Sequence, residues 1–156
     1  MIDLAIPGWG HLRLCEVVFD YNGTLARDGL MLDPARPLLP RLAAELRVHV
    51  LTGDTFGTAQ KELSGFPCAL TVMPAENQAQ AKLELIQRLG AHHVVAVGNG
   101  RNDRLMLRAA ALGIGVIGDE GIAVEALKEA DVIARHIVDA FELLLHPRRL
   151  LATLRD

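Results

Sequence analysis

The sequence predicts an α/β fold in which a doubly wound parallel sheet is covered by helices on both faces. Short apolar runs alternate with helix-like stretches along the whole chain. Most of these runs are continuously apolar, which is typical of parallel strands buried on both faces. The polar, chemically capable residues follow the runs directly, at Asp20, at Thr52 and at 99–103. Because open parallel sheets bind ligands beyond the carboxyl ends of their strands, we expect a site at that edge.

Composition limits the class of protein. The chain has 156 residues, 51% hydrophobic and 22% charged, which fits one globular domain over 1–156. A net charge of −3 gives no electrostatic reason to expect nucleic acid or an anionic membrane as partner. No apolar run approaches the roughly 18–20 residues of a membrane span, and the first residues do not resemble a signal peptide. Cys15 and Cys68 both lie in apolar stretches, so we expect free thiols and a cytoplasmic location.

The amino-terminal third predicts strands, a flap and a helix. Met1–Ile6 and His11–Phe19 read as two strands around a turn, the first of them an edge strand. Within Leu25–Leu32, the Asp28-Gly29 pair between apolar residues indicates a small β-flap close to Asp20. Asp33 as cap and Pro34 at the first position then predict a helix that runs to about Leu46.

The remaining elements alternate regularly. Thr55 or Asp54 should cap a helix that runs to about Leu63 and ends at Gly65. The expected later strands are Arg47–Leu51, Ala69–Met73, Val94–Val97, Gly113–Ile117 and Val132–Ala134. The expected later helices are 74–90, 102–112, 122–129 and 137–145, followed by further helical turns in 148–155.

Four motifs stand in order on these elements. They are Asp20-Tyr21-Asn22-Gly23-Thr24, then Leu51-Thr52-Gly53-Asp54, then Lys82 near the front of a helix, and finally the segment Gly98-Asn99-Gly100-Arg101-Asn102-Asp103. Together they resemble the haloacid dehalogenase (HAD) superfamily of phosphohydrolases, and within it most of all the phosphorylation domain of P-type ATPases. The resemblance covers about Cys15 to Arg149 and implies a Rossmann-like, HAD-like sheet.

The resemblance also implies a role for each residue. Asp20 would attack phosphorus and form an aspartyl phosphate. Thr52 and the Gly53 amide would donate to phosphate oxygens, and Lys82 would place a positive charge on the same group. Mg²⁺ would be the cofactor. Its ligands would be Asp20, the backbone carbonyl of Asn22, and the later loop through Asn99 and Asp103. Gly23 would allow the sharp turn beside the site.

Two positions depart from the family pattern. Most phosphatases of this superfamily carry an aspartate two residues after the nucleophile as general acid and base, and here that residue is Asn22. An amide cannot transfer protons in that way, so phosphatase turnover should be slow. The family also places an aspartate on the metal where this chain has Asn99, which brings an oxygen but no charge. We therefore expect metal binding to be weak or to depend on the phosphate of the substrate.

The chain also lacks segments that are present in the families it resembles. Only a flap and a helix fit between Thr24 and Thr52, and only one helix and one strand fit between Thr52 and Lys82, so we expect a capless protein with no nucleotide-binding insertion. An open site suits a large phosphorylated substrate or closure by a second subunit. The flap is unusually apolar at Leu25, Leu30, Met31 and Leu32, so a homo-oligomer (dimer or tetramer) is one expectation. A flap folded onto its own sheet is the other.

Other interpretations stay open from the sequence alone. An attenuated module that binds a phosphorylated ligand or protein partner with little turnover would also fit Asn22 and Asn99. Lys82 could lie on an exposed helix face, and Lys61 is a second candidate lysine in the wrong element. A dinucleotide-binding fold is disfavoured because the first turn lacks a Gly-x-Gly-x-x-Gly pattern. His92 and His93 should point to opposite faces, which disfavours a joint metal site.

Overall fold

A computed structural model describes residues 1–54 and 57–156 and contains a parallel sheet of six strands. In spatial order these strands are β10 (Val132–Ala134), β9 (Leu112–Val116), β8 (Val94–Gly98), β3 (Glu16–Asp20), β6 (Arg47–Thr52) and β7 (Ala69–Val72). Every neighbouring pair in it is parallel. From β3 the chain moves outward through β6 and β7, then crosses back to β8 and moves outward on the other side. The predicted doubly wound parallel sheet is confirmed.

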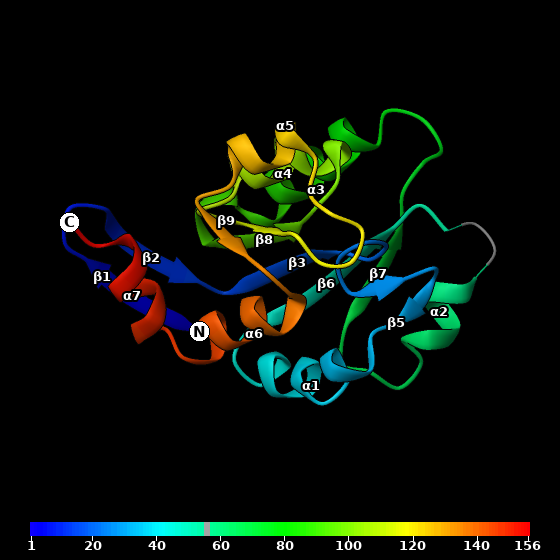
Figure 1. Cartoon of the computed structure of the whole chain (residues 1–156), viewed down its shortest axis with the longest axis horizontal. Coiled ribbons are helices and arrows are strands. Elements are labelled where there is room, and N and C mark those ends of the chain that lie inside the picture. Colours follow the sequence, from blue (N-terminus) through cyan, green and yellow to red (C-terminus); the bar gives the residue numbers. More distant parts are fainter. Residues whose placement is uncertain (55–56) are drawn as a thin grey trace.

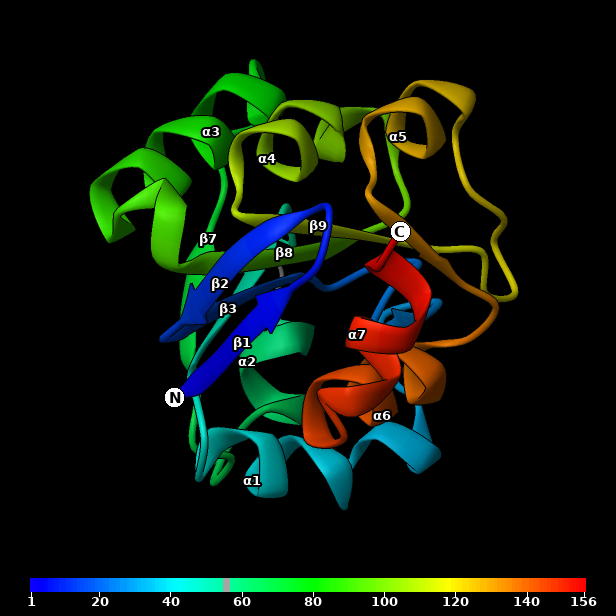
Figure 2. The same cartoon turned by 90° about the vertical axis from the view of Figure 1, so that its left-hand side faces the viewer.

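Helices cover both faces of this sheet (Figure 1). One face carries α3 (Gln78–Leu89), α4 (Arg104–Ala109) and α5 (Val124–Glu129). The other carries α1 (Leu38–Ala43), α2 (Thr58–Glu62) and α6 (Ile137–Leu145), as the rotated view in Figure 2 shows. No helix in 1–54 or 57–156 has both the length and the apolar character needed to cross a membrane.

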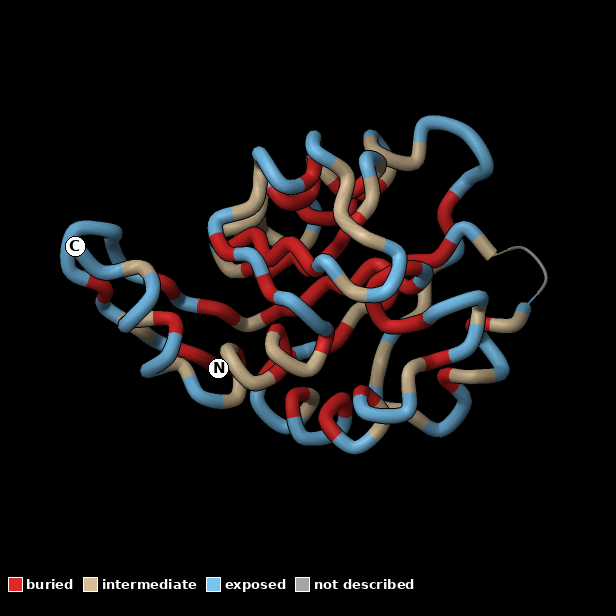
Figure 3. Tube along the Cα trace, viewed as in Figure 1, coloured by how far each residue is buried: buried red, intermediate tan, exposed pale blue. Residues whose placement is uncertain are grey.

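The core lies on the two sides of the central strands (Figure 3). All five residues of β3 are buried, and they alternate between the two apolar clusters because successive strand residues point to opposite faces. Val17 and Phe19 pack in the cluster that includes α1 and α6, and Val18 packs in the cluster beneath α3 and α4. The Phe19 ring stacks on Phe141 of α6, with ring centroids 5.1 Å apart. This burial fixes β3, and with it Asp20, in the middle of the molecule.

The amino-terminal strands differ from the prediction. The expected strand His11–Phe19 is divided at Cys15 into β2 (Gly10–Leu14) and β3, and β1 (Ile2–Ile6) pairs with β2 in a separate two-stranded sheet. The backbone of Cys15 forms hydrogen bonds with residues at or next to the starts of two other strands. Its N–H donates to His93 O at 2.9 Å, and its carbonyl accepts from Arg47 N at 2.9 Å. The chain changes sheets there because both backbone groups of Cys15 find partners outside β2.

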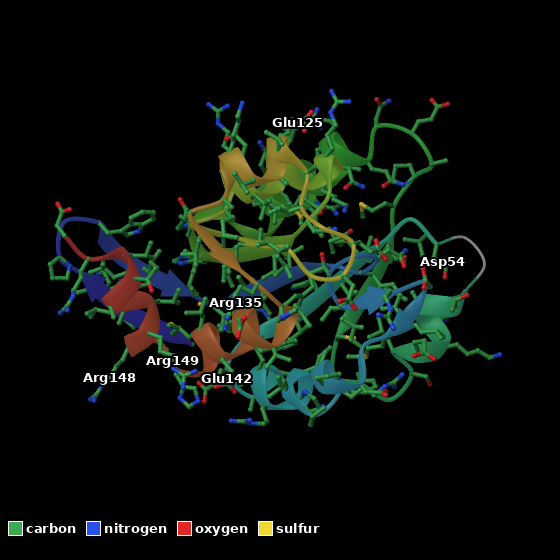
Figure 4. All side chains as sticks on the ribbon, in the orientation of Figure 1. Asp54, Glu125, Arg135, Glu142, Arg148 and Arg149 are labelled. Atoms are coloured by element: carbon green, nitrogen blue, oxygen red, sulfur yellow. The ribbon has the colours of Figure 1, made fainter. Side chains whose placement is uncertain are left out.

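The carboxyl terminus lies on this hairpin. Helix α7 (Arg148–Leu154) follows α6, and the two helices are linked by an ion pair of 2.9 Å between Arg149 and Glu142, both labelled in Figure 4. The amide of Asp156 donates to Pro7 O at 3.2 Å, so the last residue reaches the turn between β1 and β2. The hairpin and α7 thus form one unit at the end of the molecule opposite the loop that holds Asp54 (Figure 4).

Several predicted helices are wrong in extent, among them the one expected over 74–90, which begins only at Gln78. The expected helix from Asp33 to Leu46 is a 3₁₀ turn, η1 (Asp33–Ala35), followed by the short α1, and the Asp33 side chain does not cap it. Pro37 and Pro40 explain the interruption, because proline lacks an amide donor and clashes with the preceding turn. The expected helix over 102–112 is η3 (Arg101–Asp103) followed by α4, and Leu112 already belongs to β9.

Two local predictions, on the cap of α2 and on the two adjacent histidines, can also be compared with the structure. Asp54 accepts a hydrogen bond from Ala59 N of α2 at 2.9 Å, while the alternative cap Thr55 lies outside the described residues. His92 and His93 lie in the 3₁₀ turn η2 (Ala91–His93), not in a strand. Their rings are therefore adjacent, with centroids 4.0 Å apart, and do not point to opposite faces as expected.

The flap forms where the Asp28-Gly29 pair predicts it. Strands β4 (Ala26–Arg27) and β5 (Leu30–Met31) pair antiparallel on either side of that turn. Leu25 and Met31 are buried within the chain, whereas Leu30 is 59% exposed. Most of the apolar flap is therefore accounted for by the fold of its own chain. The homo-oligomer stays a prediction, now supported by the flap only through Leu30.

Candidate active site

The candidate site lies where the winding of the sheet reverses, between β3 and β8. Asp20 is the last residue of β3, and Asn99 directly follows β8. From β3 the chain continues to β6 on one side, and from β8 it continues to β9 on the other side, so the two connections diverge and open a crevice at the carboxyl edge. A cavity of about 360 Å³ lies there, lined by Asp20, Asn22, Gly53, Gln78, Asn99, Gly100, Asn102 and Glu120. We call it the site cavity.

A buried lysine lies directly behind Asp20. The Lys82 Nζ atom on α3 donates to Asp20 Oδ1 at 2.6 Å and to Asp103 Oδ1 at 2.6 Å. The lysine is 1% exposed, which settles the question of its helix face: it points inward. Asp20, Lys82 and Asp103 form what we call the lysine–carboxylate cluster. A single ammonium in it is shared by two carboxyl groups.

The surroundings of this cluster shift the pKa of Asp20 and of Lys82. Burial, followed by the charge of Asp103, raises the pKa of Asp20 to about 7, against the opposing charge and hydrogen bond of Lys82. Burial lowers the pKa of Lys82, but the charges of Asp20 and Asp103 outweigh it and hold the pKa above its ordinary value. The lysine therefore stays charged at neutral pH, and the nucleophile candidate lies in a place where further positive charge would favour its ionised form.

Asp103 anchors the loop after β8. Its Oδ2 accepts hydrogen bonds from Asn99 N at 2.9 Å and Gly100 N at 2.8 Å, and the residue is fully buried. A side chain at Gly98 would lie 2.6 Å from the Asp103 carboxyl carbon, so only glycine lets the carboxylate sit against the end of β8. Both oxygens of Asp103 are thus engaged by protein donors, and the residue positions Lys82 and the loop.

Thr24 and Asn99 link the two strand ends. The Thr24 hydroxyl lies 3.4 Å from Asp20 Oδ2 and 3.3 Å from Asn99 Oδ1, and the Asn99 amide group donates to Gly121 O at 3.0 Å. Gly23 has a φ of 79°, and an added Cβ there would lie within 2.8 Å of both the Asn99 amide and the Glu120 carboxylate. The predicted turn at Gly23 therefore needs glycine both for its backbone and for the space above it.

The residues at the end of β6 and at the start of α3 lie close together. Thr52 is buried behind the site cavity, and its Oγ1 accepts a hydrogen bond from Asp54 N at 3.0 Å. An added Cβ at Gly53 would lie 2.7 Å from Gln78 Nε2, so the amide of Gln78 reaches over Gly53. Asn102 Nδ2 donates to Gln78 Oε1 at 2.8 Å, which turns the Gln78 donor toward Gly53.

The structure brings the predicted residues together in two layers. Asp20, Asn22, Gly53 and Asn99 line the site cavity, whereas Thr52, Lys82 and Asp103 form the buried layer behind them. Sequence reasoning missed four lining residues: Gln78, Gly100, Asn102 and Glu120. Gly100 and Asn102 stand inside the last motif and could have been found there. Gln78 and Glu120 lie in no motif, and their only local signal is a polar residue beside a helix start or a glycine turn.

The donor set suits a magnesium ion. Within 1–54 and 57–156, no three His, Cys, Asp or Glu side chains gather as a metal-binding group. Among the described residues that line the site cavity, the acids are Asp20 and Glu120, and the other oxygens come from amides and backbone. Magnesium is commonly held by one or two carboxylates, keeps several waters and shares oxygens with a substrate phosphate. The excess of carboxylates over ammonium around Asp20 also favours a cation at this place.

Comparisons with known proteins find sequence relatives over part of this chain. No family model matches the chain. An uncharacterized protein of Methanocaldococcus jannaschii is 44% identical over 80 residues, covering 49% of this chain and 86% of that protein. The copper-transporting ATPase ccc2 of Schizosaccharomyces pombe is 39% identical over 89 residues, and the phospholipid-transporting ATPase tat-1 of Caenorhabditis elegans is 29% identical over 102 residues. These matches cover 56% and 64% of this chain, but the chain spans only 10% and 9% of those ATPases.

Solved structures share the fold. The 3-deoxy-D-manno-octulosonate 8-phosphate phosphatase of Moraxella catarrhalis, solved with magnesium and phosphate ions, superposes with a TM-score of 0.71 at 16% identity, covering 91% of this chain and 94% of that one. The cobalt-bound form of the Haemophilus influenzae phosphatase gives 0.71 at 13% identity, covering 92% and 94%. A phosphatase of the HAD superfamily from Bacteroides thetaiotaomicron gives 0.61 at 11% identity, covering 90% and 96%. The chain thus has the fold of the HAD superfamily phosphatases, and it belongs to the same family as the Methanocaldococcus jannaschii protein.

Proposed function

We propose that this protein is a magnesium-dependent phosphohydrolase that works through an aspartyl phosphate on Asp20. The observation that carries the proposal is the position of Asp20, which ends β3 at the switch point of the sheet. One of its oxygens is held by the buried Lys82 at 2.6 Å, while the residue also lines the site cavity. A fixed carboxylate that faces a cavity and has a cation behind it is arranged for in-line attack on phosphorus.

The reaction would proceed in two displacements. A carboxylate oxygen of Asp20 attacks phosphorus, and the bond between phosphorus and the leaving-group oxygen breaks, so that this oxygen departs and takes a proton from water. Water then attacks the aspartyl phosphate, releases inorganic phosphate and regenerates Asp20. A divalent cation held by Asp20, the Asn22 carbonyl and the loop at Asn99 would neutralise charge on the transferred group.

The other residues would hold the phosphate. Gly53 and Gln78 both line the site cavity, and the Gly53 backbone amide and the Gln78 side-chain amide would donate to phosphate oxygens, together with the Thr52 hydroxyl. Lys82 would supply positive charge as the Asp20 carboxylate becomes an acyl phosphate. Asp103 would act through Lys82 and the loop after β8, because both of its oxygens are already engaged.

The rate should be low because no carboxylate occupies position 22. Asn22 is exposed and lines the site cavity, which is where a general acid would meet the leaving group. Proton transfer from a positioned group is worth about 10²–10⁴ in rate. The same two amides, Asn22 and Asn99, favour the second candidate function, a module that binds a phosphorylated ligand with little turnover.

The substrate is proposed only by chemical class, as a phosphorylated compound of unknown leaving group. Between β3 and α3 the described residues form the flap, η1, α1, β6, α2 and β7 and no separate cap, so the site cavity is open to a large substrate or to a second subunit. Both cysteines are free, in keeping with the expected reducing, cytoplasmic setting, which stays a prediction. Light scattering at high concentration will test the oligomer: a strictly monomeric mass would rule it out.

A phosphatase panel with and without Mg²⁺ tests the proposed function. The parent should release phosphate from at least one phosphorylated compound only when Mg²⁺ is present. The isosteric change Asp20→Asn removes the nucleophile and should abolish that release, whereas Asp28→Asn in the flap turn should leave it unchanged. Full activity in Asp20→Asn would refute the covalent mechanism. Mg²⁺-dependent binding of a phosphorylated ligand with no phosphate release in the parent would favour the binding module.

A further inference from the structure

The site cavity contains one acidic residue that the proposed reaction does not use. Glu120 lies in the loop between β9 and α5 and lines the site cavity together with Asp20 and Asn99. Position 99, where the family pattern has a carboxylate, carries an amide instead. Asp103 cannot make up the difference at the cavity surface, because it is fully buried and both of its oxygens accept hydrogen bonds from protein groups.

Glu120 and Asn99 converge on one point. A Cβ added at Gly23 would lie 2.8 Å from Glu120 Oε2 and 2.7 Å from Asn99 Oδ1. The two side chains therefore come together directly above Gly23, on the side of the turn that follows Asp20. The absence of a side chain at Gly23 leaves the room in which they meet.

Asn99 holds the loop that carries Glu120. Its Nδ2 donates to Gly121 O at 3.0 Å, the carbonyl of the residue next to Glu120, and its own carbonyl accepts from Ala123 N at 2.9 Å. An aspartate at position 99 would have no hydrogen to donate to Gly121 O, and its charge would repel both that carbonyl and the Glu120 carboxylate. The amide at position 99 and the carboxylate at position 120 are thus physically compatible as a pair.

We propose that Glu120 supplies the second carboxylate toward the divalent cation, in the place where Asn99 supplies none. The inference rests on the proposed function, because it assumes that the cation is held beside Asp20. In this chain the carboxylate is carried by Glu120, in the loop after β9, and not by position 99 at the end of β8. Asn99 instead positions the loop that holds Glu120. The departure at position 99 is then a relocation of a ligand and not a loss of one.

Direct cation binding tests the relocation without reference to turnover. Mn²⁺ binding to the full chain, followed by electron paramagnetic resonance, and Mg²⁺ competition against it give the two dissociation constants. Glu120→Gln is an isosteric change at an exposed residue, so the fold should be kept. It should lower the affinity for both Mn²⁺ and Mg²⁺ by about 10–100-fold, the range found when groups that support a metal site are removed. Asp119→Asn is the matched control, because it removes the adjacent charge from an ion pair with Arg27 and should change binding less than twofold.

A second variant returns the carboxylate to position 99. In the Glu120→Gln background, Asn99→Asp should recover most of the lost cation affinity, because one carboxylate again stands at the convergence point. The proposal is overturned if Glu120→Gln binds Mn²⁺ as tightly as Asp119→Asn does, or if the double variant binds no better than Glu120→Gln. These results are independent of the phosphatase panel: a protein without turnover could still bind Mn²⁺ through Glu120, and an active phosphatase could bind it without Glu120.

Discussion

Each end of β3 carries a buried acidic residue, and the two residues differ in how far basic side chains balance their charge. Glu16 begins the strand and is met by two basic side chains of β6, with His49 Nε2 at 2.9 Å and Arg47 Nε at 2.7 Å. Asp20 ends the strand and shares the single ammonium of Lys82 with Asp103. Burial raises the pKa of Glu16, but the hydrogen bonds from Arg47 and His49 outweigh it and hold the pKa below its ordinary value. The pKa of Asp20 is raised to about 7.

This difference separates structure from chemistry within one strand of five residues. At the amino end, two basic side chains balance the charge of Glu16, so this residue is stable as an anion without a further partner. At the carboxyl end, one ammonium does not balance the charges of Asp20 and Asp103, so a cation bound in the neighbouring cavity would stabilise the cluster. Perturbed acids in clefts are candidates for function, and compensated ones are candidates for stability. The following predictions test whether the two ends differ in this way.

The largest effect is expected at Lys82. Lys82→Met removes the only ammonium shared by Asp20 and Asp103 and leaves two buried carboxyl groups facing each other. Breaking a buried ion pair in this way costs about 3–5 kcal/mol of unfolding free energy. Urea denaturation at pH 7 measures the loss, and saturating Mg²⁺ should recover part of it because the cation replaces the missing charge.

The exposed Lys61 provides the matched control for that substitution. Lys61→Met should change the unfolding free energy by less than about 0.5 kcal/mol, as is usual for surface positions. If Lys82→Met is no less stable than Lys61→Met, the lysine–carboxylate cluster does not depend on its ammonium, and the comparison between the two strand ends fails.

The next effect concerns turnover at the carboxyl end. Asn22→Asp introduces a group that can transfer protons and should raise kcat by about 10²-fold or more, with little change in KM, because a general acid acts in the transition state. Steady-state kinetics at saturating Mg²⁺ measure it. A kcat that is unchanged or lower would show that Asn22 is not the missing general acid and base, and would favour the binding module.

A smaller effect is expected at the amino end. Glu16→Gln should cost about 1–2 kcal/mol of unfolding free energy at pH 7, a value kept low because the Arg47 side chain is 77% exposed and screened by solvent. The folded pKa of Glu16 is depressed, so its contribution is complete above the unfolded value of about 4.3 and is lost as the pH falls through the folded value. The difference from the parent should therefore shrink on acidification, with Mg²⁺ having no influence.

Denaturation curves at several pH values check this, with Glu76→Gln as the control at an exposed position. The opposite pattern, in which the difference between Glu16→Gln and the parent is the same at pH 3 and pH 7, would mean that Glu16 does not stabilise the fold as an anion. If Mg²⁺ changed the stability difference between Glu16→Gln and the parent, the charge of Glu16 would not be fully balanced by Arg47 and His49.

Much of the fold follows from local pattern. Continuous apolar strands, the Asp28-Gly29 turn and the alternation of elements predict the doubly wound sheet and the flap, because burial on two faces dictates those residue types. Helix boundaries are harder to predict where prolines intervene, and Pro37 and Pro40 are the local signal for the interruption between η1 and α1. The break at Cys15 has no local signal, because it depends on backbone partners at Arg47 and His93, which only the tertiary fold provides.

The site shows the same limit. Asp20 could be predicted because strand ends in parallel sheets meet at one edge. The burial of Lys82 could not, because its neighbours Gln80 and Glu84 are polar and the direction of the side chain depends on how α3 packs. Glu120 has no local signal beyond its place beside a glycine turn, and an acid in such a place is ordinary on a protein surface. Its importance comes from the contact between two loops that follow different strands.

The most direct test of the account is the chemical identity of the phosphorylated residue. The parent is incubated with Mg²⁺ and a phosphorylated compound that it hydrolyses, quenched in acid and reduced with borohydride, which converts an aspartyl phosphate to homoserine. Peptide mass spectrometry then locates the change. The account predicts homoserine at position 20, and none in Asp20→Asn. Homoserine at another aspartate, or sustained phosphate release with position 20 unmodified in rapid-quench samples, would contradict it.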